Sequence, residues 1–155
     1  MGRYIDDILQ PGEKVLYSSN LHWVVYVRAI VAWVAAVALL VLTRFTLNEN
    51  LVLTLLASAA IVALVGLYFF VIAWFKRWTT ETDVTNLRVV HKTGFITRET
   101  FEISLDKVAS VSVNQSIMGR ILNYGDVLIE NMGNDAQPIE MIASPLAFRS
   151  NITAR

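Results

Sequence analysis

The residues that could carry out chemistry in this chain are few and far apart. Cysteine is absent, and the two histidines, His22 and His91, are separated by a long apolar stretch. A zinc site needs several ligands at suitable spacing, and an α/β-hydrolase site needs a nucleophile elbow; neither pattern is found. Asp6 and Asp7 fit a solvated N-terminal face, and Asp106 fits a turn. We therefore expect no catalytic residues, no metal and no cofactor, so that the protein is not an enzyme.

A glycine-flanked segment, GRILNYGDVLIENMG at 119–133, raises the question of a phosphate-binding loop. Such loops are Gly-rich, run from a strand into a helix and end in Lys or Ser/Thr. After Gly125, however, apolar and polar residues alternate, which predicts a strand. We therefore expect Gly119 and Gly125 to satisfy backbone geometry where a strand leaves one layer and enters the other. Gly94 is expected to lie in a turn between two strands.

The balance of charge argues against partners that are recruited by a strong electric field. The whole chain has 13 basic and 13 acidic side chains, and residues 76–155 carry nine of each. We expect no nucleic-acid partner and no polybasic cluster of the kind that captures anionic head groups. Lys92 and Arg98 could still meet across the hairpin at Thr93–Gly94 and contact lipid weakly.

Two long apolar segments fill much of the first half of the chain. The composition is 55% hydrophobic and 17% charged, whereas soluble domains have about a quarter charged residues. Residues 23–43 contain one charge, Arg28, and residues 51–75 contain none. About 20 apolar residues cross a bilayer as a helix, so we predict two transmembrane helices joined by a short extracytoplasmic loop at 44–50. Arg28 can extend its guanidinium back to the head groups; a functional intramembrane charge is the alternative.

Basic and aromatic residues near the helix ends predict the orientation. The connecting loop has only Arg44, and the outer flanks have Arg3, Lys14, Arg28, Lys76, Arg77, Arg88 and Lys92. Because such residues stay on the cytoplasmic side, and Trp collects at the interface, we expect both termini in the cytoplasm. The expected membrane-interface residues are Trp23, Arg28, Trp74, Lys76, Arg77 and Trp78.

Small residues recur at helical spacing in both predicted spans, where they could let helix backbones approach closely. They are Ala32, Ala36, Ala59, Ala63 and Gly66. These faces either pack the hairpin against itself or also pack neighbouring copies into a homo-oligomer. The sequence leaves both alternatives open.

From residue 76 onward the hydrophobic period changes from helical to two. In residues 101–105, 108–113 and 126–131, apolar and polar side chains alternate, which is typical of strands with one buried and one solvated face. About five or six such strands fit a small barrel or an orthogonal sandwich. We therefore predict a cytoplasmic β-domain at residues 76–155.

Turn residues between these segments predict antiparallel hairpins. Thr93–Gly94 separates strands at 87–92 and 96–105. Asp106–Lys107 is expected to turn the next pair, and residues 131–138 to form a longer connection.

Both ends of the chain are expected to pack on this domain. Pro145 suits the first position of a C-terminal helix. The apolar side of that helix would be formed by Leu146, Phe148 and Ile152. Residues 1–22 form a cytoplasmic segment in which a short helix at 4–9 precedes a candidate strand at 13–19. Whether that strand joins the sheet, which would make the hairpin an insertion, stays open.

Five segments of the chain carry a resemblance to a known family: PGEKVLYSSNLHW at 11–23, VTNLRVV at 84–90, EISLDKVASVSVNQS at 102–116, GRILNYGDVLIENMG at 119–133 and SPLAFR at 144–149. They resemble the bacterial pleckstrin-homology-like (PH-like) membrane proteins, in which a transmembrane hairpin precedes a PH-like domain. The resemblance spans nearly the whole chain. It implies a PH-like split barrel capped by the C-terminal helix, and it transfers no catalytic residue. Asn123 stands where a glycine is expected, but asparagine also tolerates positive φ.

The expected fold class is therefore membrane α+β, with a two-helix transmembrane hairpin and a small antiparallel PH-like split β-barrel. The expected function is that of a non-enzymatic scaffold or interaction protein of the bacterial inner membrane, which assembles with copies of itself. Membrane lipids and other membrane proteins are further expected partners. The alternative is a lipid- or small-ligand-binding module that uses the barrel or the rim around Trp78.

Overall fold

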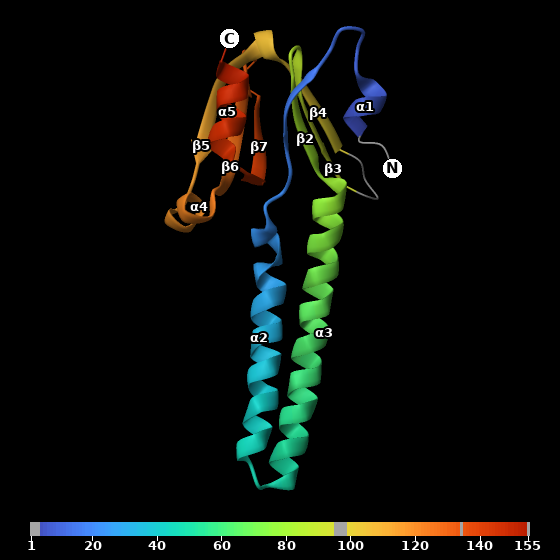
Figure 1. The fold of residues 1–155 in the computed structure, drawn as a ribbon, viewed down its shortest axis with the longest axis vertical. Helices are drawn as coiled ribbons and strands as arrows, with labels where there is room; N and C mark the ends of the chain where they lie inside the picture. The colour runs from blue at the N-terminus through green and yellow to red at the C-terminus, as the bar shows by residue number, and fades with distance from the viewer. Residues whose placement is uncertain (1–3, 95–98, 134, 155) are drawn as a thin grey trace. The chain divides into compact units, whose positions relative to one another are not determined.

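The computed structural model describes residues 4–94, 99–133 and 135–154. Arg3, Arg98 and Arg155, which entered the charge arguments, lie outside the described residues. The chain divides into two compact units (Figure 1): a helical unit at 23–75, and a β-domain made of residues 1–22 and 76–155. The described structure is α+β, and its strands form two antiparallel sheets.

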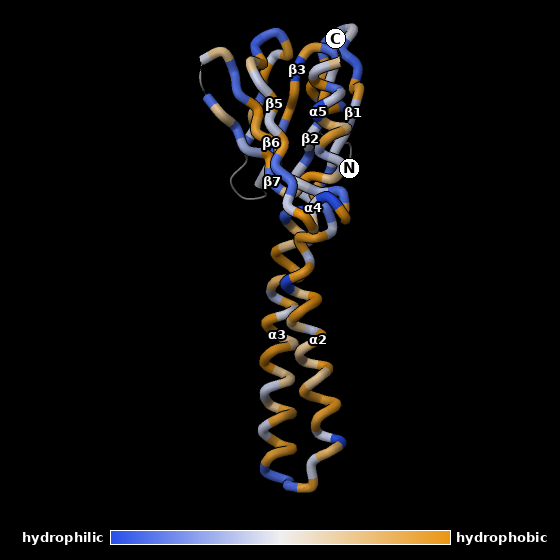
Figure 2. Tube along the Cα trace, turned by 90° about the vertical axis from the view of Figure 1, so that its left-hand side faces the viewer, coloured by the Kyte–Doolittle hydropathy of each residue, from blue (hydrophilic) through white to orange (hydrophobic). Residues whose placement is uncertain are grey.

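The helical unit is a hairpin of two apolar helices, coloured orange over most of their length in Figure 2. A 3₁₀ turn at Trp23–Tyr26 leads into α2 (Val27–Leu42), and a second 3₁₀ turn, Thr43–Phe45, follows it. The other helix, α3, spans Glu49–Thr79. The stretches 23–45 and 49–79 are each long and apolar enough to cross a membrane.

The connection between the helices is shorter than the predicted 44–50. The Oδ1 atom of Asn48 accepts hydrogen bonds from the N–H groups of Asn50 and Leu51, at 3.0 and 3.3 Å. These bonds cap the start of α3, since the first N–H groups of a helix have no partner within it. The prediction that the second helix begins at Leu51 is therefore wrong.

The small residues of the two helices lie inside the hairpin. Ala36, Ala59 and Gly66 are buried, and Ala32 and Ala63 are half-buried. The Trp33 indole lies over Gly66 so closely that a Cβ atom there would be 2.5 Å from Trp33 Cδ1. These faces therefore pack the hairpin against itself, and the alternative that they also pack neighbouring copies stays a prediction.

The described residues of the β-domain form ten further elements. In chain order they are α1 (Tyr4–Ile8), β1 (Val15–Ser19), β2 (Glu81–Thr85), β3 (Arg88–Thr93), β4 (Glu99–Ser104), a 3₁₀ turn (Leu105–Lys107), β5 (Val108–Asn114), α4 (Ile117–Leu122), β6 (Tyr124–Asn131), β7 (Ala136–Ala143) and α5 (Pro145–Thr153), the 3₁₀ turn being counted as a connection. The first sheet has the strand order β1-β2-β3-β4, and the second has the order β5-β6-β7.

Strand β1 shows that the N-terminal segment forms part of the first sheet. It pairs antiparallel with β2, with Val15 opposite Thr85 and Ser19 opposite Thr82. Strands that precede and follow the helical hairpin therefore share one sheet, and the hairpin is an insertion between two neighbouring strands.

The core lies between the inner faces of the two sheets and α5. Its fully buried members include Val84 and Val89 from the first sheet and Ile129 and Ile142 from the second. Phe148 on α5 is also fully buried. Helix α5 contacts strands β1 and β2 of one sheet and β5 and β6 of the other, so it covers one opening between them.

Leu146 does not belong to this core, contrary to the prediction. Its side chain is 58% exposed, whereas Pro145, Phe148 and Ile152 are buried. At 3.6 residues per turn, a residue two positions before Phe148 points about 200° away from it. The apolar side of α5 is therefore formed by the other three residues.

Two of the predicted connections differ from the structure. Residues 105–107 form a turn as expected, but they link β4 and β5, which belong to different sheets and do not pair. The predicted connection at 131–138 is also too long, because β7 begins at Ala136 and includes Pro138. Strand β7 is an edge of its sheet, where proline is tolerated because one side of the backbone needs no ladder bond.

The segment between β5 and β6 is a helix and not a simple turn. Gly119 lies inside α4, and β5 pairs directly with β6, so the expected change of layer at Gly119 and Gly125 is wrong. Neither glycine has positive φ; Gly94 does, at 90°. A Cβ atom at Gly119 or Gly125 would lie 2.7 Å from a backbone oxygen. The close approach of another backbone segment therefore explains why both residues are glycine. Asn123 ends α4 with φ 58°, in the left-handed conformation that was expected of it.

Candidate functional site

The inner face of the first sheet changes from apolar to polar along its strands. Residues two apart on a strand point to the same face, and the cross-strand pairs are Val89 with Ile103, His91 with Phe101, and Thr93 with Glu99. On β2 the same face continues from Val84 to Thr82, which lies opposite His91. One end of the interior is thus apolar and the other polar.

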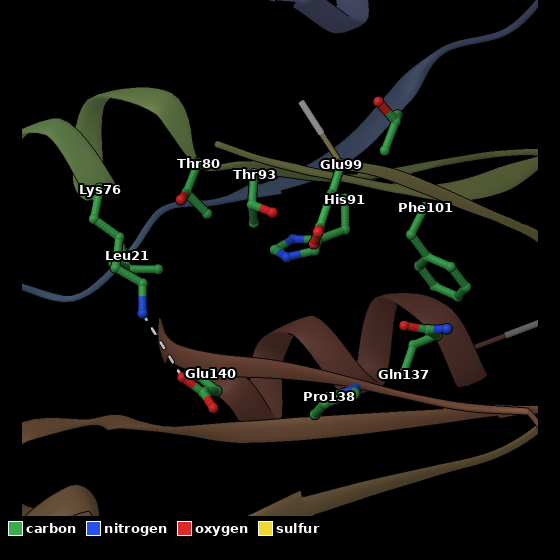
Figure 3. A pocket seen from close by; sticks show the side chains of 11 residues that line it. Leu21, Lys76, Thr80, His91, Thr93, Glu99, Phe101, Gln137, Pro138 and Glu140 are labelled. Carbon is green, nitrogen blue, oxygen red and sulfur yellow. Dashed lines mark ion pairs between the residues drawn. The ribbon is translucent and has the colours of Figure 1, made fainter. Parts of the chain in front are cut away.

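A cavity of about 520 Å³ occupies the polar end. We call it the polar mouth (Figure 3). It is lined by Leu21, Lys76, Thr80, His91, Thr93, Glu99, Thr100, Phe101, Gln137, Pro138 and Glu140. Strands β3 and β4 supply one wall, and β7 supplies the opposite one.

His91 is held in one orientation at this site. Its Nδ1 atom is 2.7 Å from Oγ1 of Thr82 on the neighbouring strand. Burial lowers the pKa of His91 from its ordinary 6.5 to about 4, because desolvation disfavours the charged imidazolium. At neutral pH the mouth therefore contains a neutral imidazole, which can donate or accept a hydrogen bond but attracts no anion.

Thr80 gives the mouth an unused hydrogen-bonding group. The residue is 3% exposed, and its Oγ1 atom is buried with no hydrogen-bond partner among the described residues. A buried hydroxyl without a partner costs about 1–3 kcal/mol of stability. A ligand hydroxyl, amide or amine that reached Thr80 would remove that cost.

The charged groups of the mouth are one amine and two carboxylates. Lys76 Nζ lies 3.7 Å from Glu140 Oε2 (Figure 3), and Glu99 is the second carboxylate. Among the described lining residues, negative charge therefore exceeds positive charge. Such a site favours a neutral or amine-bearing polar molecule over a phosphate.

A second polar cluster, not found from the sequence, joins the N-terminal segment to the first sheet. The Arg88 guanidinium donates to Glu13 at 3.0 and 3.1 Å, to Glu102 at 2.7 Å and to the Ile8 carbonyl at 2.7 Å. The Glu13 side chain is fully buried and also accepts from the Thr85 hydroxyl at 2.7 Å. Burial raises the pKa of Glu13, but hydrogen bonds from Gln10, Thr85 and Arg88 outweigh it and hold the pKa below its ordinary value.

A third group of contacts surrounds His22, the last residue of the β-domain before the helical hairpin. The His22 ring stacks on Tyr124, with centroids 5.2 Å apart, and it also bonds to the main chain of Leu122. The His22 N–H donates to the carbonyl of Met141 at 2.8 Å. Burial, and secondly the charge of Arg77, lower the pKa of His22. The chain at His22 is therefore held by contacts with Tyr124 of β6 and Met141 of β7.

Comparison with known proteins assigns the family. A model of the bacterial PH domain family matches residues 19–151. The chain belongs to the bacterial PH domain family. No match was found among curated proteins or among solved structures.

The PH domain does not gather the sequence-predicted site residues into one place. Trp23, Arg28 and Trp74 belong to the helical unit, whereas Lys76, Arg77 and Trp78 are in the last turns of α3. Of these, only Lys76 lines the polar mouth. Within the described residues, no group of three or more His, Asp or Glu side chains could hold a metal ion.

Thr80, which lines the polar mouth, and Thr82, which bonds to His91 there, gave a weak signal in the sequence. Thr80 and Thr82 occupy alternate positions that continue the buried face of Val84, and a β-branched polar residue is common in strands. Threonines at alternate positions before and within β2 (ETDVT) could have drawn attention to a polar interior. The lack of a partner for Thr80 could not have been predicted, since it depends on the positions of distant strands.

Proposed function

We propose that this chain is a non-enzymatic interaction protein of the bacterial inner membrane, whose hairpin spans the bilayer and holds the PH domain at the cytoplasmic surface. The insertion of the hairpin between β1 and β2 carries this proposal. Because those strands are hydrogen-bonded neighbours, both ends of the hairpin are attached to one sheet. We also propose that the two sheets and α5 form the split barrel of a PH-like fold.

The surface of the hairpin supports a lipid environment. In the most apolar window of each helix only 11% is buried by the protein itself. Its exposed side chains are mostly large and apolar, for example Val34, Leu53 and Leu64. Water would be a poor solvent for so long an apolar surface, whereas the hydrocarbon core of a bilayer matches it.

Self-assembly is part of the proposal. Subunits that share a fixed depth and orientation in a membrane lose less freedom on association than subunits in solution. Since the small residues are used inside the hairpin, copies would meet through the PH domain or through the larger side chains of the helices. Native mass spectrometry of protein extracted in lipid nanodiscs tests this: a discrete oligomer is expected, and a monomer at all concentrations contradicts it.

The absence of cysteine from the chain permits a direct test of topology. Leu47→Cys labels the connection between the helices, and Ser150→Cys labels α5; both positions are exposed. In intact spheroplasts a membrane-impermeant maleimide should react with the first variant, and with the second only after lysis. Equal labelling of both in intact cells would show that the hairpin does not span the membrane.

Binding of a small polar ligand in the mouth is a second candidate function, supported by the buried and unpartnered Oγ1 of Thr80. Native mass spectrometry of the gently purified chain should then detect a bound small molecule of constant mass. Thr80→Val keeps the shape of the side chain but lacks the hydroxyl, so it should release that molecule. Retention by the variant would argue against the mouth as its site.

A further inference from the structure

Helix α4 presents large apolar side chains to the outside of the PH domain. Ile117 is 80% exposed, Met118 56% and Ile121 70%. Single exposed apolar residues are common on protein surfaces, but here three of them share one helix of six residues. The helix itself has no need of these residues, since polar side chains in the same positions would form it as well.

The orientation of α4 is fixed by the residues around it. The Ser116 hydroxyl accepts a hydrogen bond from the Gly119 N–H at 3.0 Å, which caps the N-terminus. The Gln115 amide donates to the Gly119 and Tyr124 carbonyls at 3.3 and 3.0 Å. Gly119 itself is buried against Tyr124, where a Cβ atom would not fit. The glycine side of α4 therefore faces the domain, and the apolar side is held outward.

The position of α4 within the domain identifies what covers that face. Its last residue, Leu122, bonds through the main chain to the ring of His22, and His22 directly precedes Trp23, where the apolar hairpin begins. After the hairpin the chain re-enters the PH domain at Lys76. Besides burial, the charge of the next residue, Arg77, lowers the pKa of His22. Both connections to the hairpin are thus at the same end of the PH domain as α4, which is joined to the start of β6 there (Figure 1).

Charge near α4 fits the surface of a bilayer. Arg120 is exposed on the helix, and it lines a cavity of about 480 Å³ together with Arg149 and the amides of Asn114, Gln115 and Asn123. No ion pair joins either arginine to another described residue. Guanidinium groups beside an apolar face are characteristic of helices that lie at a lipid interface, where they meet phosphate groups.

We infer that α4 is an interfacial anchor: Ile117, Met118 and Ile121 enter the head-group region of the bilayer that holds the hairpin, and Arg120 binds lipid phosphate. This inference rests on the proposed function, since it requires the hairpin to span that bilayer. The PH domain is joined to the hairpin by two chain segments, and the anchor would add a third point of attachment to the membrane. This contact would fix the tilt of the domain on the bilayer.

The test uses the full chain, in nanodiscs that contain phosphatidylglycerol and phosphatidylethanolamine, with single cysteines carrying an environment-sensitive fluorophore. Ile121→Cys reports on α4. Met132→Cys is the matched control, because Met132 is also an exposed apolar residue (72%) but follows the opposite end of β6. Leu56→Cys, about two turns from the start of α3, reports independently on the insertion of the hairpin.

We expect the Ile121 label to emit at shorter wavelength than the Met132 label, to be quenched by spin-labelled lipid and to be protected from aqueous iodide. Iodide quenching of the Ile121 label equal to that of Met132, while Leu56 is quenched by lipid, would overturn the anchor and leave the spanning hairpin intact. An aqueous Leu56 label would instead overturn the proposed function. Protection of Ile121 from iodide without quenching by lipid would identify a second copy as the cover and would also overturn the anchor.

Discussion

The two ends of the PH domain's interior are built on the same strands but differ in chemistry. At the end covered by α5, the space between the sheets is filled by apolar side chains such as Phe148, Val89 and Ile142, all fully buried. At the other end, the same faces carry Thr80 and His91 around a cavity. The first end provides the free energy of folding. The second gives up part of that stability, because the Thr80 hydroxyl is buried there without a hydrogen-bond partner among the described residues.

The largest expected effect belongs to the apolar end. Phe148→Ala should lower the free energy of unfolding by about 3–5 kcal/mol, because it removes a fully buried ring and leaves a cavity. Denaturant unfolding of the full chain in nanodiscs, followed by fluorescence of the PH domain, measures it. Leu146→Ala on the exposed side of α5 is the control and should cost well under about 1 kcal/mol. Similar losses for both variants would show that α5 does not seal the core.

The Glu13–Arg88 cluster belongs to neither end of the interior. Its polar groups are bonded to one another, so it should stabilise the domain, in contrast to the polar end. Glu13→Gln should destabilise by about 3 kcal/mol, since it leaves the nearly buried Arg88 guanidinium short of a counter-charge. Glu102 contacts the same arginine but its side chain is 37% exposed. Glu102→Gln should therefore cost about 1 kcal/mol or less. Equal costs would mean that Glu13 is not buried in solution.

The polar end should make stability depend on pH. The folded pKa of His91 is about 4, against an ordinary 6.5, so between these values the unfolded chain binds the extra proton. Stability should be complete above pH 6.5 and fall by about 1.4 kcal/mol for each pH unit on the way down towards 4. His22, whose pKa is also lowered, adds a slope of the same sign.

Substitution separates these contributions. His91→Gln can still bond to the Thr82 hydroxyl and should remove the larger part of the slope, whereas His22→Gln should remove the smaller part. Glu13 does not interfere above about pH 5, because its pKa lies below the ordinary 4.5 and its stabilisation is lost only as pH falls through that lower value. A slope unchanged in His91→Gln would contradict the burial of a neutral imidazole.

The smallest expected effect has the opposite sign. Thr80→Val should raise the stability of the ligand-free chain by about 1 kcal/mol, because it replaces a buried hydroxyl without a partner by a methyl group of similar shape. The partnered Thr82 is the control, since Thr82→Val breaks its contact with His91 and should destabilise. A loss of stability in Thr80→Val would indicate that its hydroxyl is satisfied in solution.

Periodicity was sufficient to predict most elements of the PH domain. The alternation at 101–105 and 126–131 gave β4 and β6 with their correct buried faces, and Pro145 gave the start of α5. The pairing of the strands was harder to predict. Asp106–Lys107 does form a turn, but turn residues do not determine whether the next strand pairs with the preceding one or joins another sheet. The choice is made by core packing between residues distant in sequence.

The short helix α4 shows why local signals were misread. The glycines at 119 and 125 suggested a turn between layers, although Ser116 and Asn123 are the side chains that begin and end a helix. The polar mouth and the Glu13–Arg88 cluster could not be predicted from local sequence patterns. Both join segments from the two sides of the hairpin, so their composition depends on the pairing of β1 with β2, which the sequence left open.

That pairing also has a consequence for the order of events during synthesis. Ser19 must meet Thr82, and Val15 must meet Thr85, after the whole hairpin has emerged between them. Closing so long a loop is costly while it is unstructured, and contacts between distant residues form slowly. If the hairpin enters the translocation machinery as a pair of helices, its two ends come together before β2 is made. The first sheet would then be completed only in chains whose hairpin has inserted, so that β1, left without its neighbour, would mark failed insertion as an exposed strand open to proteolysis.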